Sequence, residues 1–115
     1  MPKFLFIGNY SVETAKTIMA TGGTARRTNL EKTISGLGGR LESMNFAFGS
    51  DDVFVIADLP DNKTAAAVAL TVSGTGVSHT RTVVLLTPEE LDESAQIQPA
   101  YRPPIPVPGV DEWTD

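Results

Sequence analysis

Two short runs of consecutive apolar residues constrain the fold of this chain more than any other feature. The runs are Phe4–Ile7 and Val53–Ala57. Successive side chains of a β-strand point to opposite faces, so a strand with one face in water alternates apolar and polar residues. Neither run alternates, and each therefore predicts a strand that is buried on both faces. We expect these strands at residues 3–9 and 53–58.

Two more strands are expected at residues 40–48 and 77–86. The residues Gly-Ser-Asp-Asp at 49–52 have the composition of a hairpin connection to the strand that follows them. Strict alternation in the strand at 40–48 separates two sets of side chains, with Met44, Phe46 and Phe48 on one side and Leu41, Ser43, Asn45 and Ala47 on the other.

Helix signals occupy the intervals between these strands. Ser11 can cap a helix that begins at Val12, and the pair Gly22–Gly23 interrupts this helix because glycine is unfavourable inside one. The helix resumes near Thr24 and ends at a second glycine pair. Two further helices are expected at 62–73, capped by Asp61, and after the capping box at 87–90.

The order β-α-β-β-α-β is typical of ferredoxin-like folds. We therefore predict an α+β domain in which two helices cover one face of a four-stranded antiparallel sheet. After residue 94 the chain becomes rich in proline and has few residues suited to a core. The predicted organisation is a globular domain at 1–94 and a proline-rich acidic C-terminal tail at 95–115.

The face of this sheet that the helices leave uncovered should be hydrophobic. Phe4 and Phe6 lie on one side of the first strand, and Leu5 and Ile7 lie on the other. Whichever side the helices take, the opposite side would expose a contiguous apolar surface to water. We therefore expect a homodimer or a higher homo-oligomer that pairs these faces.

Composition and charge exclude several classes of function. The chain has no cysteine and a single histidine, which excludes disulfides and thiolate zinc sites, and we predict no metal and no cofactor. Its net charge is −5; seven acids and one base from residue 88 onward give −6, and the near-neutral remainder has no basic stripe. Nucleic acid is therefore not expected as a partner. No apolar segment approaches the length of a membrane span, so we do not expect a membrane as a partner either. We expect a cytoplasmic protein.

Two short segments invite a functional interpretation that we do not favour. Asp51 and Asp52 are neighbours in a turn or strand edge, so their carboxylates should point apart rather than form an acid–base pair. The segment Gly22–Thr24, followed by Arg26 and Arg27, resembles a phosphate cradle only loosely. It follows a helix and lacks the P-loop lysine, so we interpret it as a helix break.

Four polar residues are candidates for ligand binding. His79 and Arg81 lie two apart on one strand face, where they could hold an anion, be solvated, or leave Arg81 paired with a carboxylate. Tyr10 could offer its hydroxyl to a ligand between sheet and helices, or lie at a rim. Asn45 is either a pocket group or a buried amide with backbone partners. No catalytic residue can be assigned.

Several stretches together resemble the GYD family of small bacterial domains. FLFIGNYSVE is similar to the opening strand and turn of that family, and Arg26 precedes Gly38–Gly39 as the family's arginine precedes its paired glycines. GSDDVFVIADLPDNKTAAAVAL follows the motif that names the family, with Asp51 in the place of its tyrosine. The closing strand and helix are matched by Gly76, Thr80–Thr82 and Thr87–Glu90. The resemblance covers residues 2–90 and implies a dimeric α+β barrel without an assigned activity.

Three functions stay open at this level. The first is an oligomeric module that binds a small anionic or aromatic ligand, or is otherwise unassigned. The second is a cofactor-independent monooxygenase or isomerase of the dimeric-barrel kind, in which His79, Tyr10 and Asn45 would polarise or deprotonate a substrate. The third is a small regulatory protein whose acidic tail docks on another chain. An enclosed pocket lined by His79 would favour the enzyme.

Overall fold

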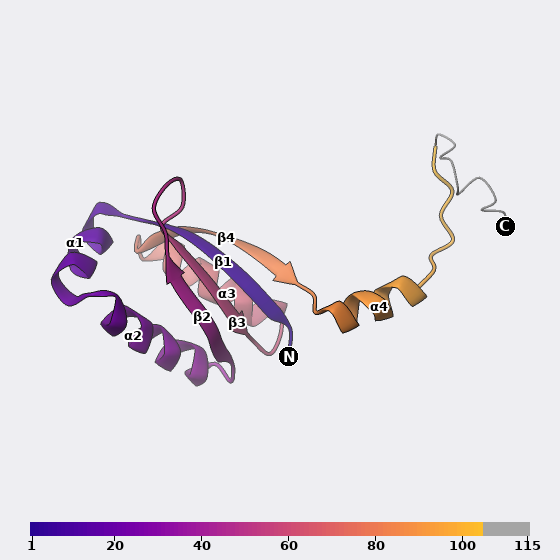
Figure 1. Ribbon diagram of the computed structural model, residues 1–115, viewed down its shortest axis with the longest axis horizontal. Coiled ribbons are helices and arrows are strands. Elements are labelled where there is room, and N and C mark those ends of the chain that lie inside the picture. The colour runs from indigo at the N-terminus through magenta and orange to yellow at the C-terminus, as the bar shows by residue number, and fades with distance from the viewer. Residues whose placement is uncertain (105–115) are drawn as a thin grey trace. The chain divides into compact units, whose positions relative to one another are not determined.

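The computed structural model describes residues 1–104, in which Met1–Leu85 form one compact unit and the residues from Leu86 onward belong to a second (Figure 1). The first unit contains β1 (Lys3–Tyr10), α1 (Val12–Thr21), α2 (Gly23–Gly36), β2 (Arg40–Phe46), β3 (Val53–Asp58), α3 (Asn62–Gly74) and β4 (Ser78–Leu85). The second contains α4 (Pro88–Gln96), which starts with the expected capping box at Thr87 and Glu90. The last residues of the predicted tail, 105–115, lie outside the described residues.

The sheet has the strand order β2-β3-β1-β4, and all neighbouring strands are antiparallel. This arrangement confirms the predicted ferredoxin-like α+β fold. Two predicted helix caps are also confirmed, since Ser11 Oγ accepts from the Thr14 amide at 3.1 Å and Asp61 Oδ1 from the Thr64 amide at 2.8 Å. The predicted break at Gly22–Gly23 separates α1 from α2, and Gly22 takes a φ of 84°, which favours glycine.

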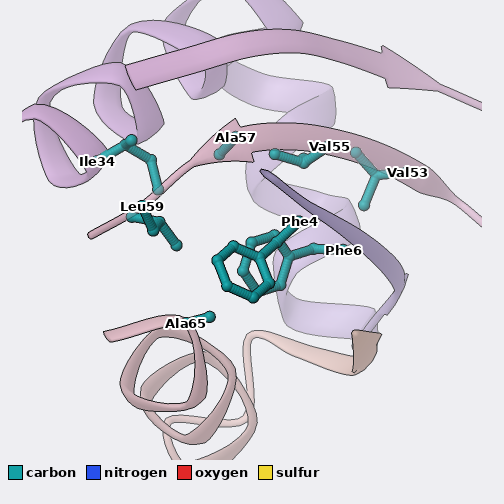
Figure 2. Close-up of a cluster of buried hydrophobic side chains, with 8 residues drawn as sticks. All are labelled: Phe4, Phe6, Ile34, Val53, Val55, Ala57, Leu59 and Ala65. Carbon is teal, nitrogen blue, oxygen red and sulfur yellow. The ribbon is translucent and has the colours of Figure 1, made fainter. Parts of the chain in front are cut away.

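The core lies between the sheet and the two helices α2 and α3. Figure 2 shows the rings of Phe4 and Phe6 side by side, with Ala65 from α3 facing them and Ile34 from α2 beside Leu59. The two rings have centroids 6.4 Å apart. The buried cluster comprises Phe4, Phe6, Ile34, Val53, Val55, Ala57, Leu59 and Ala65. Both helices therefore cover the face of the sheet that carries Phe4 and Phe6.

The opposite face of the sheet has no helix of the first unit over it, and we call it the free face. Leu5 lies opposite Ile56 of β3 and Val83 of β4, and Ile7 lies opposite Phe54. Both strands are apolar on both faces, as predicted, but burial on both faces is not observed within the first unit, where Leu5, Phe54 and Ile56 are only partly buried. Five apolar side chains form the middle of the free face: Leu5, Ile7, Phe54, Ile56 and Val83.

Ion pairs lie at one end of the free face. Lys3 Nζ contacts Glu42 Oε1 at 2.6 Å and Asp58 Oδ1 at 3.0 Å, and Arg40 reaches Asp58 Oδ2 at 3.3 Å. The hydrogen bond to Glu42 is the main reason that the pKa of Lys3 is raised.

The alternation predicted for the second strand is wrong at two points. The pairing of β2 with β3 shifts between Leu41 and Ser43, so that Leu41 lies opposite Ala57 and Ser43 lies opposite Ile56. This bulge moves Leu41 to the helix-covered face, away from Ser43 and Asn45. In addition, β2 ends at Phe46, and Phe48 is fully exposed in the loop that follows.

Candidate functional site

A cleft of about 530 Å³ opens between α2 and α3 on the helix-covered face of the sheet. Its volume lies within the range of roughly 300–1,000 Å³ that is usual for small-molecule sites. The apolar part of its lining comes from the sheet and from both helices. These residues are Phe6, Met44, Val53 and Val55 of the sheet, Leu30 and Ile34 of α2, and Val68 and Val72 of α3.

Small residues line this cleft on β1 and on α3. Gly8 lies in its lining on β1, where an added Cβ would stand 2.6 Å from Ser78 Oγ and 3.0 Å from Val53 Cγ1. On α3, Ala67 and Ala69 line the cleft with single methyl groups. These residues of α3 therefore border the cleft with side chains too small to fill it.

Tyr10 places a buried hydroxyl in the lining of the cleft. The oxygen exposes less than 1 Å² and has no hydrogen-bond partner among the described residues. The ring packs near Phe46, with centroids 6.3 Å apart, and the Cζ atom of Arg26 lies 5.7 Å from the ring centroid of Tyr10. Burial raises the pKa of Tyr10, and the nearby guanidinium of Arg26 partly opposes this rise through its charge and through a contact with the hydroxyl that falls short of hydrogen-bond geometry. The phenol is therefore held in its neutral, hydrogen-donating form.

Arg26 lines the cleft, although sequence reasoning used it only for the family resemblance and for a discarded phosphate cradle and did not name it as a site residue. It lines the cleft together with Leu30 and Ile34, which follow it on α2 in steps of four residues. Residues four apart share a helix face, so this spacing was the signal that Arg26 belongs to the cleft rather than to solvent.

The structure separates the four predicted site residues. Tyr10 lines the cleft, whereas His79, Arg81 and Asn45 lie on the free face. In the strand register, His79 lies opposite Asn9, Arg81 opposite Ile7 and Asn45 opposite Phe54. His79 and Asn45 are exposed. Asn45 is thus neither a pocket group nor a buried amide, and the three residues of the enzymatic hypothesis do not converge on one place. His79 and Arg81 do share a strand face, as expected.

The carboxylates of Asp51 and Asp52 bind different partners. Asp51 Oδ2 contacts Arg81 at 3.3 Å, and Asp52 Oδ2 accepts a hydrogen bond from the Tyr10 amide at 2.9 Å. The backbone of Asp52 is also bonded to Gly8 and Ala47. These contacts agree with their interpretation as turn and strand-edge residues.

The GYD domain family model matches residues 4–95, which include the whole sheet except Lys3 and the whole of α4 except Gln96. The chain belongs to the GYD domain family. No curated protein and no solved structure gives a significant match. The resemblance noted from the sequence is thus confirmed, and both Tyr10 and Arg26 lie within the matched part of this GYD domain.

Within residues 1–104 of this GYD domain, no group of three or more histidine, cysteine or acidic side chains could hold a metal ion. The same residues contain no helix with the length and hydrophobicity needed to cross a membrane. The cleft between α2 and α3 combines a largely apolar lining with the buried Tyr10 hydroxyl, which makes it a candidate ligand site of the GYD domain.

Proposed function

We propose that this GYD domain is a module that binds a small, largely apolar ligand in the cleft between α2 and α3. The observation that carries the proposal is the buried Tyr10 hydroxyl, which lines an apolar cleft and has no partner among the described residues. Buried polar side chains in folded proteins nearly always have a hydrogen-bond partner. A ligand that accepts a hydrogen bond from Tyr10 would supply one, with a small side-chain movement that uncovers the oxygen.

The lining of the cleft supports binding over catalysis. No imidazole or carboxylate of residues 1–104 lines it. General acid–base chemistry requires a group that titrates near neutral pH within reach of the substrate, and Tyr10 has a raised pKa. A binding module is therefore better supported than a monooxygenase or an isomerase.

The module acts as a homodimer that pairs its free faces. The free face carries Leu5, Phe54, Ile56 and the 41%-exposed Val83, and leaving such a surface in water costs about 25 cal/mol per Å². A second copy offers the same apolar surface, and a two-fold axis closes the assembly. The ion pairs at Lys3 and Arg40 lie at the edge of this surface, as the polar rim of an interface does.

A neutral apolar fluorophore tests the cleft directly. N-phenyl-1-naphthylamine gains fluorescence when it leaves water, and we expect saturable binding to the wild-type protein. Replacing Ala67 by phenylalanine fills the mouth of the cleft and should reduce this binding strongly. Ala66→Phe is the matched control, because Ala66 is also exposed on α3 but does not line the cleft.

Amide chemical shifts from NMR would identify the residues that the probe contacts. We expect changes at Gly8, Leu30 and Val72, which line the cleft from three different elements. Absence of binding, or equal loss of binding in the two phenylalanine variants, would overturn the proposal.

A further inference from the structure

The two charged residues that line the cleft are both cationic, and a nearby carboxylate, that of Asp52, accepts the Tyr10 amide hydrogen from outside the lining. Arg26 and Lys32 of α2 line it, and none of the described residues in its lining is acidic. The part of the chain that forms the cleft is itself nearly neutral, because residues 1–87 contain eight bases and seven acids and the acidic excess lies after them. The two cations therefore make the lining of the cleft locally positive, which favours a negatively charged ligand.

Arg26 is the cation placed to meet the polar end of such a ligand. It forms no ion pair within residues 1–104, whereas the adjacent Arg27 is paired with Glu31 at 3.7 Å. Arg26 is also partly buried, so its charge is less well solvated than that of the exposed Lys32. Its guanidinium lies over the ring of Tyr10, so two hydrogen-bond donors stand at the same end of the cleft.

We propose that the ligand of this GYD domain is an amphipathic organic acid. Its carboxylate is held by the Arg26 guanidinium and the Tyr10 hydroxyl, and its apolar body lies along the side chains of Phe6, Val55 and Leu30. The planar guanidinium matches the two oxygens of a carboxylate, and the phenol adds a third donor. This inference rests on the proposed function, because it specifies the class of molecule that the cleft binds.

A pair of probes of nearly identical shape separates the inference from the function on which it rests. The 2-naphthoate ion and its neutral analogue 2-naphthamide share one apolar body and differ in the charge of the head group. Isothermal titration calorimetry at neutral pH should show naphthoate binding more tightly by about ten-fold or more, as charge-assisted hydrogen bonds are roughly twice as strong as neutral ones.

Two arginine variants locate the source of this preference. Arg26→Gln should bring the affinities for the two probes close to each other. Arg27→Gln removes the same charge from the next residue, whose side chain does not line the cleft, and should keep the preference. Tyr10→Phe should weaken naphthoate binding several-fold without abolishing it, because Arg26 stays in place.

The outcomes distinguish the two claims. If naphthamide and N-phenyl-1-naphthylamine bind in the cleft and naphthoate binds no more tightly than naphthamide, the inference of an acidic ligand is refuted. The proposed function of the cleft as a ligand site is then still supported. If the preference survives in Arg26→Gln or is lost equally in Arg27→Gln, the site assigned to the carboxylate is wrong. If none of the three probes binds, the proposed function itself fails.

Discussion

Replacing Tyr10 by phenylalanine should make the protein more stable while weakening its ligand binding. The Tyr10 hydroxyl exposes less than 1 Å² and has no partner among the described residues. A buried polar group without a hydrogen bond costs roughly 1–3 kcal/mol. The substitution removes that group and keeps the ring with its contacts to Phe46 and Arg26.

The expected gain is about 1 kcal/mol, the lower end of that range, because a small void replaces the oxygen. For a domain of this size, such a gain raises the melting temperature by roughly 4–8 °C. Urea denaturation of the unliganded protein measures the free energy of unfolding, and calorimetry measures the melting temperature. Tyr10→Leu is the control. It removes the aromatic ring as well as the hydroxyl, and it should therefore destabilise the protein.

The pH dependence of stability offers a second readout. Burial raises the pKa of Tyr10 above its usual value of 10.0 in the folded state. The folded state therefore binds the phenolic proton more tightly, and stability present below pH 10.0 is lost as the pH rises through the raised pKa. The phenylalanine variant should lack this part of the alkaline loss. If Tyr10→Phe is less stable than the wild type by about 1 kcal/mol, the hydroxyl has a partner in the folded protein and the reasoning is refuted.

Four further predictions concern the rest of the molecule. Leu5→Asp places a charge in the free face, so light scattering should report monomer or aggregate where the wild type is at least a dimer at micromolar concentration; a soluble wild-type monomer would contradict the dimer. Truncation after residue 94 should leave urea unfolding cooperative, since every strand precedes that point; a large drop in melting temperature would show that the tail is structural. If His79 and Arg81 hold an anion on the free face, small carboxylates should bind more weakly to the alanine variants of both residues, and unchanged binding would exclude that site. Burial opposes ionisation of Asp58, but hydrogen bonds from Lys3 and Arg40 outweigh it and lower the pKa of Asp58 below 3.8. Stability that is present above pH 3.8 is therefore lost as the pH falls through the lowered pKa. Asp58→Asn should lose less stability in acid than the wild type, and an equal loss would contradict this prediction.

The fold was predictable because each of its signals is local. Consecutive apolar residues in β1 and β3 indicated strands buried on both faces, and Ser11 and Asp61 marked helix starts through bonds to residues three positions away. The bulge near Glu42 was not predictable in this way. It depends on pairing with β3, and the carboxylate of Glu42 binds Lys3, which lies far away in the sequence.

The candidate site was predictable only in part. Tyr10 has the same strand parity as Phe4 and Phe6, so its position on the helix-covered face follows from the sequence once those two residues are placed in the core. The side taken by His79 depends instead on the register of β4 against β1. The cleft depends on where α2 and α3 come to lie on the sheet, and on the close approach of Gly8 to Ser78 from a distant strand. No local pattern encodes those contacts.

The adjacent aspartates show how the fold leaves the Tyr10 hydroxyl available to a ligand. Asp52 accepts the Tyr10 amide hydrogen, and Phe46 packs against the ring, so the position of this residue is fixed without using its hydroxyl. Asp51, one residue earlier, holds Arg81 on the free face. The loop between β2 and β3 is therefore tied both to the strand end that bears Tyr10 and to β4. Because backbone and ring contacts anchor Tyr10, the donor in the cleft is kept in place at a cost in stability that a purely structural phenylalanine would avoid.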